Sequence, residues 1–262
     1  MMVNNLRSRP ECCILAGMPD DHRVAAELAV EAGRRLRELR SRPGDAATLG
    51  REGDRIANEY LVGELRTRYP ADSILSEESP DDERRLHASR VWMIDTLDGT
   101  REYSERDRTD WAVHVALWRA GSIEAAAVAL PARAMVLQTG DPPVAVAKRP
   151  ARPRMVVSRT RPAPFTAAVA EAVDAEVLPM GSAGAKTAAV LTGDAEIYLH
   201  GGGQYEWDSA APAGVARASG LHVSRIDGSA LVYNQRHPWI ADLLICVPEH
   251  ADALLSALAR HS

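Results

Sequence analysis

The sequence predicts an α/β protein built from two subdomains. Two stretches near the N-terminus repeat apolar residues at helical spacing, and short apolar runs rich in β-branched residues alternate with small-residue helical stretches further on. A proline-rich segment interrupts this pattern near the middle of the chain. A chain of 262 residues can bury roughly 70 to 75% of its unfolded surface, so it can form a sizeable core.

The first half of the chain begins with two predicted helices. Residues 20–39 place apolar side chains at helical spacing behind Asp20 and Asp21, which can cap the helix start. A second helical pattern opens at Asp54, whose ordinary role here is an N-cap, and ends before Pro70. Strands are predicted at residues 73–76, 91–94, 111–118, 123–130 and 135–139, the last three as an antiparallel meander.

The second half follows a segment, residues 140–154, that carries four prolines among small and basic residues. We therefore divide the chain into an N-terminal α+β subdomain, residues 1–145, and a C-terminal α/β subdomain, residues 146–262. The second subdomain is predicted to hold strands at residues 155–158, 197–199, 221–224 and 243–247, and helices at residues 165–173, 184–191, 210–218 and 250–260.

The composition excludes several classes of function. The net charge is −5 with both signs interspersed, which argues against a nucleic acid polymer as partner. No apolar run approaches the roughly 18 residues that span a bilayer, and residues 1–16 are too polar for a signal peptide, so we expect a cytoplasmic protein that does not bind membranes. The three cysteines, Cys12, Cys13 and Cys246, lack metal-binding spacing and are expected to be free thiols.

The most informative stretch is the end of the predicted strand at residues 91–94. It leads into Asp95 and Asp98, two carboxylates three residues apart around a turn. Because ligands of open α/β sheets gather outside the carboxyl ends of strands, this turn suggests a site for hard cations and oxyanions. Glu77 and Asp208 also lie at the ends of predicted elements. Four such carboxylates about 6 Å apart would repel by roughly 17 kcal/mol in total, so their convergence would require metal ions, protons or basic partners.

Each acidic position can also be explained by an ordinary structural role. Glu77 with Glu78 is typical of a solvated loop, and Asp98 with Gly99 is typical of a turn. Asp208 alone is more often an N-cap. The order of these motifs along the chain is what favours the site.

Three segments together resemble the inositol monophosphatase superfamily. They are Leu-Ser-Glu-Glu-Ser at residues 75–79, Ile-Asp-Thr-Leu-Asp-Gly-Thr at residues 94–100, and Glu-Trp-Asp-Ser-Ala-Ala-Pro at residues 206–212. Residues 110–114, 181–186 and 204–208 most resemble the CysQ-like branch, 3′(2′),5′-bisphosphate nucleotidases of sulfur metabolism. The resemblance spans roughly residues 20–247 and implies a layered α-β-α-β-α sandwich.

The resemblance also implies a set of site residues. The metal ligands would be Glu77, Asp95, the Leu97 carbonyl, Asp98 and Asp208, and they would hold two or three Mg²⁺ ions; Mn²⁺ is a possible substitute and Li⁺ an inhibitor. Thr100, aided by Asp54 and Glu77, would orient and activate the attacking water. Backbone N–H groups of Gly99 and Thr100 would hold phosphate oxygens, with further substrate contacts from Asp98, Ser182, Lys186 and Asp208. The protein would act as a monomer or homodimer.

The sequence departs from the family pattern at two places. Thr96 stands where proline is usual, and a looser turn is expected there unless other contacts hold it. The segment at residues 49–53 lacks the usual threonine before Asp54, which puts the assigned role of Asp54 in question.

Several side chains near these motifs have two readings. Lys186, close to the Ser182 helix start, either binds a second phosphate or is an ordinary solvated lysine. Tyr205 and Trp207 either stack on a base or simply pack beside a helix start. His114 is expected to be a core histidine, and His200 is a weaker candidate for a pocket group.

Taken together, these residues predict a magnesium-dependent phosphomonoesterase. The predicted substrate is a small phosphorylated metabolite, the 3′-phosphate of adenosine 3′,5′-bisphosphate (PAP) or of its 5′-phosphosulfate counterpart (PAPS), hydrolysed by metal-activated water to AMP and phosphate in the case of PAP. Inositol monophosphatase or fructose-1,6-bisphosphatase activity is the alternative, since it would use the same ligands. A regulatory protein that binds metal and anion without turnover is the rival from another class.

Overall fold

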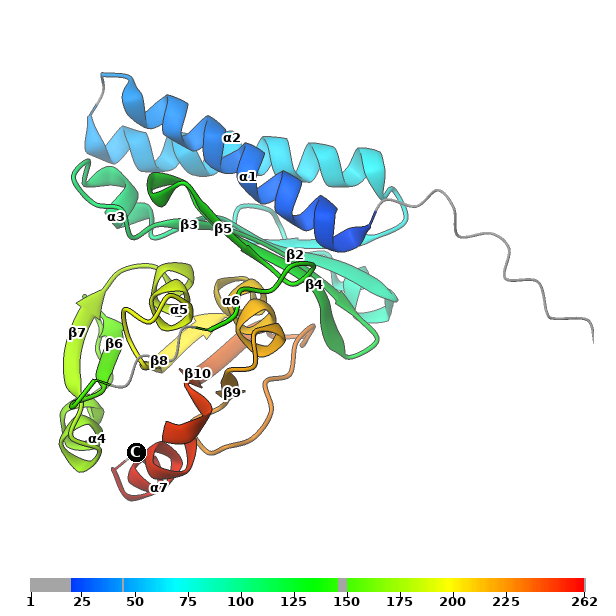
Figure 1. The fold of residues 1–262 in the computed structure, drawn as a ribbon. Coiled ribbons are helices and arrows are strands. Elements are labelled where there is room, and N and C mark those ends of the chain that lie inside the picture. Colours follow the sequence, from blue (N-terminus) through cyan, green and yellow to red (C-terminus); the bar gives the residue numbers. More distant parts are fainter. Residues whose placement is uncertain (1–19, 44, 146–149, 262) are drawn as a thin grey trace, which may run out of the picture.

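Five layers of secondary structure form the fold of this protein, for which a computed structural model describes residues 20–43, 45–145 and 150–261 (Figure 1). From top to bottom in Figure 1 the layers are a helix pair, a sheet, a second helix pair, a second sheet and a last helix pair. The predicted α-β-α-β-α sandwich is therefore confirmed. Among the described residues no helix is long and apolar enough to cross a membrane.

The first sheet has the order β1-β2-β3-β4-β5, with β1 parallel to β2 and the other neighbours antiparallel. The predicted meander is thus confirmed. The outer helices α1 and α2 cover one face of this sheet (Figure 1). The elements of this half are α1 (Asp21–Ser41), α2 (Ala46–Arg68), β1 (Ser73–Ser76), η1 (Glu83–His87), β2 (Arg90–Asp98), α3 (Thr100–Ser104), β3 (Ala112–Arg119), β4 (Ser122–Leu130), η2 (Pro131–Arg133) and β5 (Met135–Gln138).

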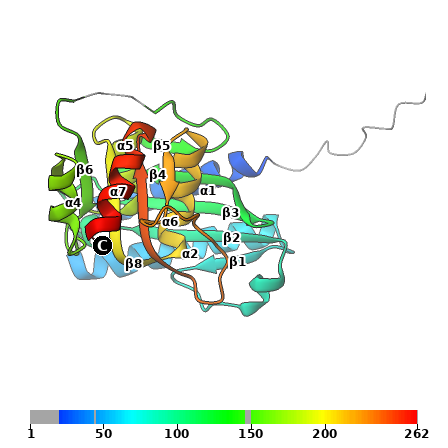
Figure 2. The same cartoon turned by 90° about the horizontal axis from the view of Figure 1, so that it is seen from below.

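The second sheet has the order β7-β6-β8-β10-β9 and mixes parallel and antiparallel pairs. Seen from below in Figure 2, α7 and α4 lie against its outer face. Its elements, with the helices around it, are β6 (Arg154–Ser158), α4 (Thr166–Ala172), β7 (Glu176–Met180), α5 (Ala183–Leu191), β8 (Ile197–Tyr205), α6 (Glu206–Ala218), β9 (His222–Ser224), β10 (Trp239–Cys246), η3 (Pro248–His250) and α7 (Ala251–His261).

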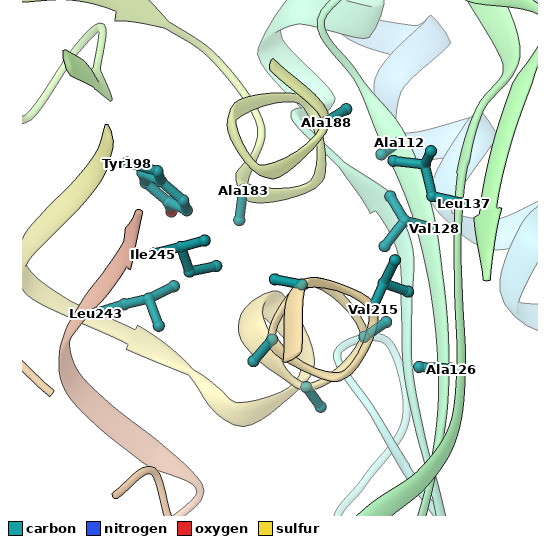
Figure 3. Packing of buried hydrophobic residues seen from close by; sticks show 14 of the residues in the cluster. Ala112, Ala126, Val128, Leu137, Ala183, Ala188, Tyr198, Val215, Leu243 and Ile245 are labelled. Carbon is teal, nitrogen blue, oxygen red and sulfur yellow. The ribbon is translucent and has the colours of Figure 1, made fainter. Parts of the chain in front are cut away.

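The middle layer, α5 and α6, packs between the two sheets, and Figure 3 shows both helices with side chains of each sheet around them. Alanine dominates the buried positions of both helices. Small side chains let the helices approach both sheets closely: a Cβ on Gly214 of α6 would lie 2.8 Å from Ile123 Cγ2 of β4. This close packing places the N-terminal ends of α5 and α6 near the carboxyl end of β2.

Strand β2 is buried on both faces, which explains its continuous apolar sequence. Val91 and Met93 point into the core shared with α5 and α6, whereas Trp92 and Ile94 point toward α1 and α2. The strand runs four residues beyond the predicted end at Ile94. Asp95 and Asp98 therefore belong to the strand end itself.

Two further boundaries differ from prediction. Helix α2 begins at Ala46 and not at Asp54, because Asp45 caps it: Thr48 N donates to Asp45 Oδ2 at 3.2 Å. Strand β8 continues to Tyr205, six residues past the predicted end at Leu199, by pairing with β10 through a bulge.

Some predictions concern parts of the chain outside the described residues. The proposed subdomain boundary between residues 145 and 146 adjoins residues 146–149, which are outside them, and stays a prediction. Cys12 and Cys13 also lie outside the described residues. Cys246 is a buried free thiol in β10, as expected.

Candidate active site

The carboxyl ends of β1 and β2 bring the first acidic residues together. The two strands are parallel neighbours, with Ser76 of β1 paired with Ile94 of β2. Glu77 follows β1 directly, and Asp95, Leu97 and Asp98 form the end of β2. Parallel pairing puts both strand ends at the same edge of the sheet, which is why residues nearly 20 positions apart in sequence face one site.

The turn after β2 is held by side-chain contacts in place of proline. Asp95 Oδ1 accepts the Leu97 N–H at 3.1 Å, and Thr100 Oγ1 donates to the Leu97 carbonyl at 3.1 Å. Gly99 has a φ of 86°, in the left-handed region that glycine favours. Thr96 is fully buried, and its hydroxyl has no hydrogen-bond partner among the residues that the structure describes. The contacts of Asp95 and Thr100 supply the restraint that Thr96 lacks.

Asp208 enters the site from the first turn of α6. Its Oδ2 accepts the Tyr205 N–H at 2.6 Å, so the side chain caps the helix while it faces the acidic turn. One carboxylate oxygen each from Asp95, Asp98 and Asp208 lies within 4.8 Å of the others. At that separation each charged pair would repel by roughly 3 kcal/mol. The trio therefore requires a bound cation, protons or basic partners.

The pKa values report this crowding. Burial, then the charge of Glu77, raises the pKa of Asp95 well above its usual range. Burial and the Asp208 charge raise the pKa of Glu77 to about 8. Burial and the Asp98 charge raise that of Asp208 to about 6. Glu77 is not a member of the close trio, but its charge acts on the same site.

Asp98 is the exception because it is surrounded by donors. Burial opposes its charge, but contacts with His114, Lys186 and Ser182 outweigh burial and lower its pKa. Its Oδ2 accepts the Ser182 hydroxyl at 2.5 Å and the Gly184 N–H at 2.8 Å, and lies 3.1 Å from His114 Nε2. Ser182 and Gly184 belong to the start of α5, so Asp98 ties the first sheet to the second half of the chain.

Thr100 and Asp54 lie on elements that pack together. Gly50 of α2 approaches so closely that a Cβ there would lie 2.8 Å from Thr100 Cγ2. Asp54 is on the same helix, one turn later. Its Oδ1 is buried with no hydrogen-bond partner in the described part of the chain, and burial with the Glu78 charge raises the pKa of Asp54 to about 7. Asp54 is therefore inside the helix and not its N-cap, and the Thr100 hydroxyl bonds to Leu97 instead.

A cavity of about 560 Å³ is lined by Glu77, Asp98, Thr100 and Asp208 of this site. Lys186 lines it; its ammonium group is buried, donates to the Ser182 carbonyl at 2.8 Å and lies 5.1 Å from the Tyr198 ring centroid. Burial lowers the pKa of Lys186, although the Asp98 charge opposes this. The solvated-lysine reading is excluded by this burial.

Sequence reasoning missed several residues of this site. His114 is buried as expected, but it lies beside Asp98 because β3 pairs with β2 and places His114 opposite Asp95. Arg159 lines the cavity and pairs with Glu102 at 2.7 Å and Glu105 at 3.0 Å. Trp239 reaches the cavity from β10. Of these residues, only His114 could have been placed near Asp98 from the sequence, because its predicted strand follows the strand that ends in the acidic turn.

Comparison with known proteins identifies the protein family and the enzyme class of this chain. The inositol monophosphatase family matches residues 21–262, and the chain belongs to that family. It is accordingly an enzyme of the phosphoric monoester hydrolase class.

Individual relatives have names that are more specific than the family name. The protein called 3′-phosphoadenosine 5′-phosphate phosphatase from Mycobacterium leprae (strain TN) is 47% identical over 252 residues, 91% of this chain and 93% of that protein. The 3′(2′),5′-bisphosphate nucleotidase CysQ of Escherichia coli (strain K12) is 30% identical over 199 residues, 71% of this chain and 80% of that protein. The structure of CysQ from Bacteroides thetaiotaomicron has the same fold, with a TM-score of 0.74 at 22% identity, covering 86% of this chain and 96% of that one.

Proposed function

We propose that this enzyme hydrolyses the 3′-phosphate of PAP, releasing AMP and inorganic phosphate, with Mg²⁺ as cofactor. The observation that carries the substrate is the 47% identity, over nearly the whole of both chains, to the relative named for that activity. The cavity supports it, since acidic side chains, the buried Lys186, arginines and aromatic rings all line one space large enough for a nucleotide.

The donor set of the site fits magnesium. Glu77, Asp95, Asp98, Asp208 and the Leu97 carbonyl offer only oxygen atoms, the ligands that Mg²⁺ and Mn²⁺ prefer. Among the described residues, the side-chain hydrogen bonds of Asp98 are accepted by Oδ2, which leaves Oδ1 to bind a cation. When bound, two or three such ions supply a Lewis acid that lowers the pKa of water and offsets phosphoryl charge. Inhibition by Li⁺ belongs to the same proposal.

The residues around the turn position the reactants. Thr100 donates its hydroxyl hydrogen bond to the Leu97 carbonyl, so the lone pairs of its oxygen can accept a hydrogen bond from the attacking water and orient it. Burial and the Glu78 charge raise the pKa of Asp54 to about 7, which suits a general base, and Glu77 would aid it from the metal site. Backbone N–H groups of Gly99 and Thr100 would hold the phosphate oxygens at the start of α3.

The rest of the substrate would lie toward α5 and β8. Lys186 and Ser182 are close to Asp98, and the Lys186 charge acts on both Asp98 and Asp208. We assign these two residues to the second phosphate of the substrate. Arg161 lines the same cavity and, within the part of the chain that the structure describes, forms no ion pair with a carboxylate. It is a further cation for that phosphate.

Other phosphomonoesters would use the same ligands. Inositol 1-phosphate and fructose 1,6-bisphosphate are the alternatives to PAP, and PAPS is a second nucleotide candidate. A protein that binds metal and anion without turnover is disfavoured by the complete acidic set, Glu77, Asp95, Asp98 and Asp208, together with Thr100.

The test is phosphate release from PAP, PAPS, inositol 1-phosphate and fructose 1,6-bisphosphate, each with Mg²⁺ and with chelator. We expect the highest kcat/KM for PAP and no release with chelator. Asp98→Asn should reduce turnover by at least ~100-fold while the circular dichroism spectrum stays unchanged. A higher kcat/KM for inositol or sugar phosphate would reject the nucleotide assignment, and near wild-type turnover of Asp98→Asn would reject the metal-ligand set.

A further inference from the structure

Three aromatic side chains form one wall of the cavity: Tyr205, Trp207 and Trp239. The Tyr205 and Trp207 rings are stacked, with centroids 4.5 Å apart and planes 11° apart. Trp239 meets Tyr205 edge-on, with centroids 5.1 Å apart at 85°. We refer to these three residues as the aromatic wall.

The aromatic wall remains in solvent to an unusual degree. Tyr205 is 45% exposed and Trp239 is 48% exposed, although most other large apolar side chains of the described residues are covered. Exposed aromatic surface inside a polar cavity is costly unless a ligand covers it. Within the described residues, no part of the chain covers the exposed rings of Tyr205 and Trp239, so they are available to a ligand.

The backbone around the wall is shaped to hold it. Gly202 and Gly203 have φ values of 104° and 86°, and a Cβ on Gly203 would lie 1.8 Å from Trp239 Cζ2. The Trp239 ring thus lies directly against the backbone of β8. Glu206 N donates to the Pro238 carbonyl at 2.9 Å, which ties the start of α6 to the residue before Trp239. The three rings of the wall are thus packed against one another and against the backbone of β8.

Two contacts also connect the aromatic wall to the acidic site. The Tyr205 N–H donates to Asp208 Oδ2 at 2.6 Å, and the Trp207 carbonyl is 3.4 Å from Nδ1 of His114, the histidine beside Asp98. A ligand with a phosphate at the acidic trio would extend along this side of the same cavity.

We propose that the aromatic wall receives the base of the nucleotide substrate by stacking and so sets the preference for nucleotides over sugar and inositol phosphates. The inference rests on the proposed function. Stacking on an aromatic side chain suits a planar base, because both surfaces are flat and polarizable, whereas an inositol or sugar ring has no planar π-face to stack.

The experiment compares AMP with ribose 5-phosphate, which lacks only the base. Binding of both is measured by calorimetry with Mg²⁺ for the wild type, Trp239→Leu, and the double variant Tyr205→Leu, Trp239→Leu. We expect the wild type to bind AMP at least ~10-fold more tightly than ribose 5-phosphate. The double variant should lose about 10-fold in AMP affinity and change within about twofold for ribose 5-phosphate.

Three further measurements make the result specific. Trp239→Phe, which keeps an aromatic ring, should restore most of the AMP affinity that Trp239→Leu loses. Tyr60→Leu, on α2 and outside the cavity, should leave both affinities unchanged. With PAP as substrate, the double variant should raise KM about 10-fold while kcat changes less than about threefold.

Two outcomes would overturn the inference: an unchanged ratio of the two affinities in the double variant, or an equal loss for both ligands, which would show a structural role alone. Failure of the proposed function is seen separately. If the wild type releases no phosphate from PAP, that function is rejected, whereas the ratio of AMP to ribose 5-phosphate binding still decides whether the wall receives a base.

Discussion

Asp54→Asn should make the metal-free protein more stable and the enzyme less active. The Asp54 carboxyl is partly buried in α2, its Oδ1 has no partner, and its pKa is raised from 3.8 to about 7 by burial and by the Glu78 charge. A carboxyl that is harder to ionise in the folded protein destabilises the fold once it is ionised. Asparagine removes that charge at nearly the same volume.

The sign and size of the stability change follow from the linkage between proton binding and folding. Between about pH 4 and pH 7 the folded protein holds a proton on Asp54 that the unfolded chain has released, so wild-type stability falls as pH rises through this window. Three pKa units correspond to roughly 4 kcal/mol for a fully buried group, and partial exposure reduces this to about 2 kcal/mol. The free energy of unfolding of Asp54→Asn should thus exceed that of wild type by ~0 at pH 4 and about 2 kcal/mol at pH 8.

The assay is urea denaturation and thermal denaturation in EDTA at pH 5, 6, 7 and 8. Turnover is measured in parallel with Mg²⁺. The melting temperature of the variant at pH 8 should be roughly 4 to 8 °C higher. Turnover should fall by about 100-fold or more if Asp54 acts on the attacking water. Glu59→Gln, an exposed position on the same helix paired with Arg55, is the control and should show no such pH dependence.

Two results would refute the reasoning. A stability difference that does not grow between pH 5 and pH 8 would show that the Asp54 carboxyl is solvated or partnered. Increased stability with wild-type turnover would show a strained residue that takes no part in the chemistry.

Three other predictions each concern one or two side chains in or beside the site. Lys186→Met should lower kcat/KM about 10-fold more for a bisphosphorylated than for a monophosphorylated nucleotide, and equal losses on both would remove Lys186 from the second phosphate. Thr96→Val should raise the free energy of unfolding by about 1 kcal/mol, because it removes a buried hydroxyl without a partner; urea denaturation showing a loss would contradict this. Saturating Mg²⁺ should raise the melting temperature more at pH 8 than at pH 6, because protons on Glu77 and Asp208, with pKa values of about 8 and 6, compete with the cation at the lower pH; equal shifts would argue against these ligands.

The sequence by itself was sufficient for the α/β class and for the acidic motifs, whereas the layered arrangement was implied by the family resemblance. Local patterns carry this information: the spacing of Asp95 and Asp98 at the end of an apolar run, and the helical spacing in the first helix, are properties of contiguous residues. It was insufficient for the start of α2, where two glycines concealed a helix that close packing against Thr100 and Leu97 stabilises.

Only the tertiary structure decided which neighbours act on those motifs. His114 contacts Asp98 because of strand register, Ser182 and Gly184 reach it from a helix more than 80 residues later, and Trp239 meets Tyr205 through the pairing of β8 with β10. None of these contacts is local in sequence. The pKa values of the acidic residues likewise depend on burial and on charges brought from separate elements, and spacing along one chain does not encode either quantity.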